Sequence, residues 1–421
     1  MLYFAVLRHV EASRVALIPL MTPVIALFLG HAVDGETIGP RALAGTAVIR
    51  IGLACYQWGS VAAASRLTCV GCRPDETASV GRIESHAPST IHCRMDSVTQ
   101  ALLGAAVGEA TLGPRVGAKA PLWGAILGTL PDLDVLYPFA DPVSAFTWHR
   151  GPSHSLFVLA AVTPVVVWLI LKLHPGSAEH RRGWYRLVLM VFGTHVLLDC
   201  FTVYGTQALW PLPVPPVGWA TIFIIDPLYT LPLAAGVLAA LLLRRRPERA
   251  WRWNLAGLTL SSLYLAWSAG AKLYVDHRVR DILAQEGVPY EHLQTQPTPF
   301  NTLLWRVVGV NGERYFEGLW SLASPEKGLT LTHYEHRPEL LAGIDGSPAV
   351  QRLQWFTRGL YRVVQDDQGV VVSDLRMGLD PDYVFAFRVA EMRNPHPKPI
   401  APERVRTEQD VRRLRALWER I

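Results

Sequence analysis

Charged residues and cysteines are both scarce in this chain of 421 residues. Only 18% of the residues are Asp, Glu, Lys or Arg, whereas 50% are hydrophobic, and the mean hydropathy is +0.20. This composition excludes an ordinary soluble enzyme and is typical of a membrane protein with a soluble part. None of the five cysteines lies beyond Cys200, so the C-terminal third can form no disulfide and no disulfide framework is indicated.

The positive net charge does not indicate a nucleic-acid partner. The chain carries a formal charge of +5, but its basic residues gather in short runs beside apolar segments. Membrane topology explains that distribution better, because basic residues accumulate in the cytoplasmic loops of membrane proteins. We therefore expect the lipid bilayer to be the partner of this chain, with no nucleic acid.

Apolar runs near the length of a membrane span recur along the chain. A helix needs roughly 20 apolar residues to cross a bilayer. Two shorter runs, 97–112 and 118–130, are rich in glycine and predict short, tilted or re-entrant helices that pack closely. The longer runs, which predict spanning helices, are 13–30, 41–57, 154–173, 187–203, 226–243 and 253–271.

From about residue 276 onward the sequence is charged and mixed. Alternating stretches such as Leu303–Val310 and Tyr383–Val389 predict strands of a soluble α+β domain. The fold class is therefore mainly α, with a polytopic helical membrane domain followed by a smaller soluble α+β domain. The predicted divisions are a helix pair at 1–58, a linker at 59–94, the membrane domain at 95–275 and the soluble domain at 276–421. The histidines of the soluble domain are interpreted as surface residues: His292, His333, His336 and His396.

The arginines give the helices an orientation. Segments without Lys or Arg, at Val203–Ile225 and Val135–Trp148, should face outward. Counting spans from these anchors predicts a multi-pass protein of the bacterial inner membrane whose C-terminal domain is periplasmic. The loops predicted to be cytoplasmic carry Arg181, Arg182 and Arg186 in one case, and Arg244, Arg245, Arg246, Arg249 and Arg252 in the other.

The first 58 residues differ in character from the rest of the chain. The run LRHVEASRVALIPLMTPVIALFLGHAVDGETIGPRALAGTAVIRIGLACYQWG resembles the C-terminal helix pair of EamA-type drug/metabolite transporters. In that family the pair ends a ten-helix protein, so one pair alone could not form a transport pathway. Met95 then opens MDSVTQALLGAAVGEA, which is typical of a native start. We interpret residues 1–58 as a gene fusion or the result of a misassigned start codon.

A first candidate site lies in the acidic sequence Asp132-Leu133-Asp134. Pro131 is expected to end the short apolar helix before it, which places both carboxylates at the outer end of that helix. Carboxylates there are costly without a partner cation. Solvated acids in an interfacial loop are the alternative for this pair taken alone.

A second cluster supplies two imidazoles five residues apart, His149 and His154. Neutral imidazole is the commonest nitrogen ligand of zinc and related metals. The intervening turn contains Arg150, which could bind an anionic substrate oxygen in bidentate fashion, and Ser153, a further candidate substrate contact. The alternative is that Arg150 anchors to lipid headgroups while the histidines sit in the interface.

A third cluster pairs His195 with Asp199 on one face of a predicted transmembrane helix, at i and i+4. A carboxylate within an apolar span is a functional candidate, because only a cation or hydrogen bonds offset its desolvation. A structural His–Asp pair, or an Asp199 that merely orients His195, are the alternatives. Thr202 and Thr206, just downstream, could contact substrate, cap the helix or only pack.

The three clusters converge on one predicted face of the membrane. Together they predict a divalent metal site, with zinc as the expected ion and manganese as the alternative, that would lower the pKa of a bound water. Six candidate ligands exceed the needs of one tetrahedral zinc, so two metals, or one metal with a spare acid or base, stay open. One of the three carboxylates could be the general base. The candidates are Asp132, Asp134, His149, His154, His195 and Asp199, with Asp132, Asp134 and Arg150 as candidate catalytic residues.

Four motifs in order, MDSVTQALLGAAVGE, GTLPDLD, HRGPSHS and THVLLDCFTVYGTQ, resemble the YdjM-type family of membrane-bound metal-dependent hydrolases over about residues 95–275. The resemblance implies that the same six residues bind metal. Many relatives carry His where this chain has Gln100, and Glu109 is a possible substitute ligand. A distant likeness of the family to zinc-dependent phospholipase C and single-strand nucleases implies a phosphoester substrate.

The expected function is thus an inner-membrane metal-dependent hydrolase, acting on a phosphoester or lipid at the outer face. A membrane transporter is one alternative, motivated by residues 1–58 and by charged residues within spans, although no inverted repeat is evident in residues 95–275. A non-catalytic membrane scaffold or regulator, whose C-terminal domain binds an unknown protein, is the other.

Overall fold

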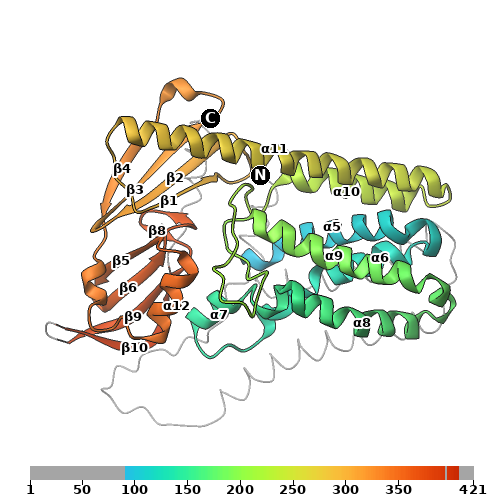
Figure 1. The fold of residues 1–421 in the computed structure, drawn as a ribbon, viewed down its shortest axis with the longest axis horizontal. Helices are drawn as coiled ribbons and strands as arrows, with labels where there is room; N and C mark the ends of the chain where they lie inside the picture. The colour runs from blue at the N-terminus through green and yellow to red at the C-terminus, as the bar shows by residue number, and fades with distance from the viewer. Residues whose placement is uncertain (1–90, 394–395, 407–421) are drawn as a thin grey trace, which may run out of the picture. The chain divides into compact units, whose positions relative to one another are not determined.

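The fold is taken from a computed structural model, which describes residues 91–393 and 396–406 (Figure 1). The predicted helices at 13–30 and 41–57 and the linker at 59–94 lie outside the described residues or at their very edge. The described part consists of a helical region followed by a C-terminal domain rich in β-sheet. That order confirms the coarse fold class expected from the sequence.

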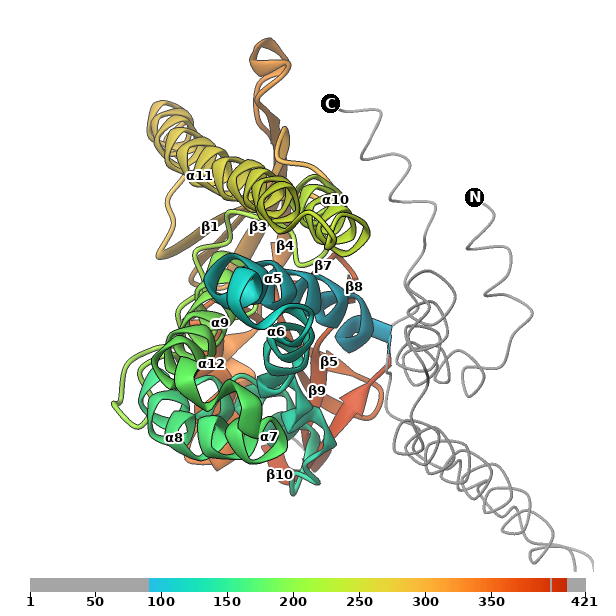
Figure 2. The same ribbon diagram turned by 90° about the vertical axis from the view of Figure 1, so that its right-hand side faces the viewer.

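The helical region is organised around its first helix, α5 (Ile91–Val116), which packs against α6, α9, α10 and α11 (Figure 2). Short 3-10 turns and one short helix, α7, connect the longer helices. The long helices after α5 are α6 (Lys119–Thr129), α8 (Leu156–Leu173), α9 (Arg181–Phe201), α10 (Pro227–Leu242) and α11 (Pro247–Gln285). The connecting elements are η1 (Pro131–Leu136), α7 (Pro142–Trp148), η2 (Pro152–His154) and η3 (Pro175–His180).

Two helical stretches of the described chain are long and apolar enough to cross a membrane. They are Leu156–Leu173 and Pro175–Phe201, and the 16-residue α10 is a shorter apolar helix. The first stretch leaves large apolar side chains exposed, including Val165 and Trp168. An apolar surface of this kind is typical of a helix that faces lipid. A membrane location is therefore supported, while the larger number of spans stays a prediction.

Glycines let α5 and α6 approach closely, as the composition of these two runs indicated. A Cβ added at Gly104 would lie 2.1 Å from the carbonyl oxygen of Gly124, and one added at Gly128 would lie 2.4 Å from that of Gln100. No side chain fits at these positions, because the contacting atoms belong to backbone. Close helix contact through small residues is a common way to associate helices where lipid removes the hydrophobic driving force.

We expect Gly124→Val to destabilise the helical region by about 1–3 kcal/mol, the usual cost of overpacking a filled core. Its added side chain would collide with the backbone at Gly104 and Ala105. Thermal unfolding of the purified protein in detergent measures the effect. Gly193→Ala is the control, because a Cβ at Gly193 meets no atom within 4 Å. Equal unfolding temperatures for the two variants would show that the α5–α6 contact is not tight.

The C-terminal domain contains two four-stranded antiparallel sheets. One has the order β1-β2-β3-β4 and the other β10-β9-β6-β5, while β7 and β8 pair separately. The first sheet comprises β1 (His292–Pro297), β2 (Leu304–Asn311), β3 (Arg314–Ser321) and β4 (Thr330–Glu335). The rest comprise β5 (Tyr361–Asp366), β6 (Gly369–Asp374), β7 (Gly378–Leu379), β8 (Asp382–Tyr383), β9 (Ala386–Arg393), β10 (His396–Val405), α12 (Pro348–Thr357), η4 (Pro325–Lys327) and η5 (Pro338–Leu341).

The helical region and the C-terminal domain share secondary structure and core. The division expected at residue 275 lies inside α11, whose last turns pack Val275 and Val279 against Trp305 of the first sheet. Within the segment predicted to face outward, Val135–Trp148, the last seven residues form α7, and Phe146 of this helix is buried among residues of the C-terminal domain. The two parts are thus joined by a continuous helix and by a common apolar cluster.

One end of the helical region carries the C-terminal domain, and the other carries the arginine-rich loops (Figure 1). The C-terminal end of α9 and the turns η1 and η2 lie at the first end, where α12 packs on α7. The arginines in the first turns of α9, and those that run from the α10–α11 connection into the start of α11, lie at the other. This arrangement agrees with the expectation that the candidate site and the C-terminal domain lie on the same side.

His336 is buried, which corrects its interpretation as a surface residue. Only 4% of its surface is exposed, and its Nδ1 accepts a hydrogen bond of 3.1 Å from the backbone N–H of Val363. Accepting that bond requires a neutral ring. Burial lowers the pKa of His336 to about 4. The residue follows the end of β4, and no local pattern of residues indicates that the chain turns inward there.

The stability of the C-terminal domain should fall as the pH drops from 6.5 towards 4. The folded pKa of His336 lies below its ordinary value of 6.5, so the unfolded chain binds more protons in that range. His336→Asn retains an acceptor without titrating and should remove this part of the pH dependence. The measurement is urea unfolding followed by tryptophan fluorescence at several pH values. His333→Asn, at an exposed position, should keep the wild-type slope; identical slopes for all three proteins would contradict the assignment.

Candidate metal centre

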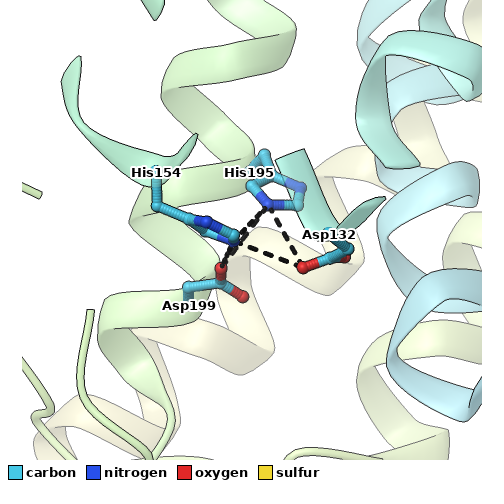
Figure 3. Close-up of side chains that lie close together, drawn as sticks. All are labelled: Asp132, His154, His195 and Asp199. Carbon is cyan, nitrogen blue, oxygen red and sulfur yellow. Dashed lines mark hydrogen bonds and ion pairs between the residues drawn. The ribbon is translucent and has the colours of Figure 1, made fainter. Parts of the chain in front are cut away.

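Three separate elements bring four candidate ligands to one place (Figure 3). Asp132 comes from η1, which begins at Pro131, one residue beyond the end of α6, so the helix ends before the proline as expected. His154 ends η2, and His195 and Asp199 lie one turn apart near the end of α9. The last three are fully buried, and Asp132 is 12% exposed, which makes it the edge of the cluster nearest to solvent.

The distances between the four ligand atoms suit one small cation. The Nε2 atoms of His154 and His195 lie 3.1 Å apart, and that of His154 is 3.2 Å from Asp132 Oδ1. The Asp199 Oδ2 atom is 3.1 Å from His154 and 3.5 Å from His195. Ligands about 2.0–2.1 Å from a tetrahedral zinc lie roughly 3.3 Å from one another. The two nitrogens and two carboxylate oxygens therefore form a donor set that could hold a metal ion.

Hydrogen bonds on the far side of each imidazole direct its Nε2 lone pair into the cluster. His195 Nδ1 lies 2.8 Å from the carbonyl oxygen of Gly128, which can only accept, so Nδ1 carries the proton. His154 Nδ1 lies 2.9 Å from Ser153 Oγ, which donates to Asp134 and therefore accepts from the ring. Such outer bonds fix the tautomer of metal-binding histidines.

The two carboxylates of the cluster need a positive charge nearby to balance them. Burial would lower the pKa of His154, but hydrogen bonds and charge from Asp132 and Asp199 raise it to about 9. A proton on this ring thus balances the carboxylates when no metal is bound, and a metal ion would replace it. In addition, within residues 91–393 and 396–406 the buried Asp132 Oδ2 has no hydrogen-bond partner, as expected for an atom that awaits another partner.

Asp134 and His149 lie beside the cluster and are not part of it, in contrast to the sequence prediction. Their side chains pair with each other at 2.7 Å. Asp134 also accepts hydrogen bonds from Ser153 Oγ and from the backbone N–H of Arg150. Although burial would raise the pKa of Asp134, these bonds and the charge of His149 hold it at about 2. A carboxylate with so many donors is a weak base, so this residue positions the turn that carries His154.

Arg150 completes the charge balance around Asp199. Its Nη2 lies 3.3 Å from Asp199 Oδ1, and its Nη1 donates to Thr202 Oγ1 at 3.0 Å. Arg150 has a positive φ of 61°, which is uncommon for a residue with a side chain. Two bonds hold this conformation: its N–H donates to Asp134, and its carbonyl accepts from the N–H of Gln207.

The three predicted substrate-contact residues each have different neighbours in the structure. Ser153 belongs to the layer behind His154, and Thr202 contacts Arg150 and the backbone of Asp199. Thr206 bonds through its backbone to Val217, and its buried hydroxyl has no hydrogen-bond partner within residues 91–393 and 396–406. Thr206 therefore helps to shape the loop beside Arg150.

Gln100 is a member of the site that was not among the predicted ligands. It is fully buried on α5, and its Nε2 donates to Asp199 Oδ1 at 2.9 Å and to the carbonyl of His195 at 3.4 Å. Gln100 stands where many relatives carry His, and it still contacts two of the candidate metal ligands. Glu109, considered as a substitute, does not belong to the cluster. The signal for Gln100 was an amide within an otherwise apolar run.

Comparison with known families finds two matches in this chain. Residues 95–289 match the YdjM inner membrane protein family. The match confirms the resemblance noted in the sequence and extends it to residue 289, just beyond α11. Residues 1–57 match the EamA-like transporter family, which confirms the second resemblance, although those residues lie outside the described part.

A relative with a similar sequence is the uncharacterized protein YfhP of Bacillus subtilis (strain 168). It is 32% identical over 140 residues, which are 32% of this chain and 42% of that protein. The chain thus spans less than half the length of this relative. No solved structure matches the chain.

We expect the purified full-length protein to bind about one equivalent of zinc or manganese per chain, as one four-ligand cluster allows. His154→Ala or Asp199→Asn should abolish binding, whereas Asp134→Asn should weaken it by about 10–100-fold, as loss of an outer partner does. Elemental analysis after dialysis, and titration with metal, give these values. His277→Ala, at an exposed position on α11, is the matched control. Equal metal content in parent and His154→Ala would refute the site.

Proposed function

We propose that this protein is a metal-dependent hydrolase of the inner membrane that cleaves a lipid phosphoester at the outer face. The observation that carries the proposal is the buried cluster of Asp132, His154, His195 and Asp199, whose four ligand atoms all lie within 4.8 Å of one another. A divalent ion held there, zinc by its preference for nitrogen and oxygen ligands, would supply Lewis acidity and lower the pKa of a water molecule.

The chain itself offers groups for the remaining tasks of hydrolysis. The guanidinium of Arg150 lies at the cluster and could hold a phosphoryl oxygen, a geometry for which arginine is well suited. The Oδ2 atom of Asp132, which has no hydrogen-bond partner among the described residues, could take a proton from the attacking water. Asp134 holds His149, Ser153 and the Arg150 backbone in place by hydrogen bonds, so we assign it a positioning role.

A lipid substrate is supported by the surface around Asp132. The same 3-10 turn that carries this ligand, with the residue after it, exposes large apolar side chains: Leu133 is 51%, Leu136 76% and Tyr137 65% exposed. Exposed apolar side chains next to a candidate span are typical of segments that rest in the membrane interface. A lipid could therefore present its phosphoester to the cluster without leaving the bilayer.

The outer face is supported by the position of the arginines. The cluster lies at the end of the helical region that carries the C-terminal domain, opposite the arginine-rich loops (Figure 1). By the positive-inside rule those loops are cytoplasmic, which would place the metal centre and the C-terminal domain on the periplasmic side.

Purified protein with added zinc or manganese should hydrolyse phospholipid vesicles, and the activity should disappear with a chelator. Asp199→Asn and His154→Ala should lower the rate at least about 100-fold, because each removes a ligand of the ion that activates water. Release of the headgroup, measured beside phosphomonoester and phosphodiester test compounds, defines the substrate class. Hydrolysis that survives in both variants would contradict the proposal, as would metal binding without hydrolysis of any of the three substrate types.

The proposal that the substrate is a membrane lipid can be tested separately. The double variant Leu136→Ser, Tyr137→Ser should lower the rate on vesicles and leave the rate on a soluble ester unchanged, because neither residue is a ligand. Equal losses on both substrates would indicate damage to the site and would exclude a role in lipid access.

A further inference from the structure

A second candidate ligand site lies at the opposite end of the helical region, where α5 ends and α9 begins (Figure 2). A pocket of about 510 Å³ opens there, a volume within the roughly 300–1,000 Å³ that is usual for small-molecule sites. Its floor includes the buried Leu112, and Gly183 of α9 faces that leucine. The remaining lining residues are polar: Arg115, Glu179, His180, Arg181, Arg182 and Arg186.

The pocket carries an excess of positive charge that the chain does not neutralise. Four arginines face a single carboxylate, that of Glu179, which lies 3.7 Å from His180. Within the part of the chain that the structure describes, none of these four arginines forms an ion pair with Asp or Glu. Four guanidinium groups around one concave surface repel one another, and an anionic ligand would remove that repulsion.

The surface below the pocket identifies the kind of anion. Arg182 and Arg186 lie on the same face of α9 as Leu189, Met190 and Leu197, since these positions are spaced by whole helical turns. The three apolar side chains are 46%, 53% and 47% exposed, and they continue from the arginines along a candidate membrane span. A charged end followed by an apolar stripe matches the shape of a phospholipid, with its phosphate at the arginines and an acyl chain along α9.

We propose that this pocket binds the phosphate headgroup of an anionic phospholipid at the membrane surface opposite the metal centre. The proposal does not depend on hydrolysis at the metal centre, because it concerns different residues at the other end of the helices. A free phosphate ion would satisfy the arginines but would leave the apolar stripe unused. The stripe therefore favours the lipid.

The test uses full-length protein in detergent, with phosphatidylglycerol and phosphatidylcholine added together, and native mass spectrometry to count the lipids retained. The double variant Arg182→Gln, Arg186→Gln should bind phosphatidylglycerol about 25-fold more weakly, from about fivefold for each arginine at an anionic lipid. The matched control, Arg249→Gln with Arg252→Gln, removes two exposed arginines from the same membrane side but outside the pocket. It should bind phosphatidylglycerol as the parent does.

Equal losses in the two double variants would overturn the proposal, because they would show that general surface charge attracts the lipid. Retention of phosphatidylglycerol by the pocket variant would overturn it as well, as would displacement of the lipid by an equal concentration of inorganic phosphate, which would show that a free anion is the ligand. The single variant Arg115→Gln, which changes the α5 side of the pocket, provides an independent measurement if the double variant does not fold, and the metal content of each variant reports on folding.

Discussion

The charge of two buried carboxylates is the constraint around which the helical region is built. Asp132 and Asp199 share a small volume with two imidazole nitrogens, and such a group is stable only with a compensating cation. Arg150 supplies part of that charge from one side, and a proton on His154 supplies more when no metal is present. The same anionic character that makes the site expensive to bury makes it a strong attractor for a divalent ion.

The cluster can form only because the backbone behind it is held closely. The His195 ring is oriented by the carbonyl of Gly128, which α6 can offer because glycines let α5 and α6 touch backbone to backbone. That contact also brings Gln100 of α5 within reach of Asp199. The close packing of α5 and α6 through small residues thus helps to position two metal ligands, because it allows the hydrogen bonds from His195 to Gly128 and from Gln100 to Asp199.

Local patterns in the sequence predicted the core of the site. Two of these patterns are local to one element each: the i, i+4 spacing of His195 and Asp199, and the helix-ending Pro131 before Asp132. The structure has both features as predicted. The separation of ligands from outer partners could not be predicted this way. Whether Asp134 or Asp132 joins the ligand cluster with His154 depends on how η1 and η2 meet, which is a contact between distant residues that no periodicity encodes.

The fold prediction was also limited because contacts between distant residues leave no local pattern in the sequence. The absence of Lys and Arg predicted that Val135–Trp148 faces outward, but it did not predict that part of this segment folds as α7 and packs under the C-terminal domain. The change of composition near residue 276 records where α11 leaves the other helices and meets a sheet, and a helix can continue through such a change of surroundings. Composition reports the environment of a segment and does not report where its backbone breaks.

The continuous α11 and the apolar cluster around Phe146 have a consequence for the modular nature of the protein. The family match ends at residue 289, just beyond this helix. A chain cut there would uncover Phe146 and Tyr204, and Thr147 would lose the hydrogen bonds from Arg352. His149 follows directly after α7. In this protein the C-terminal domain therefore supports the helix that leads into His149 and, a few residues later, into the turn η2 that carries His154.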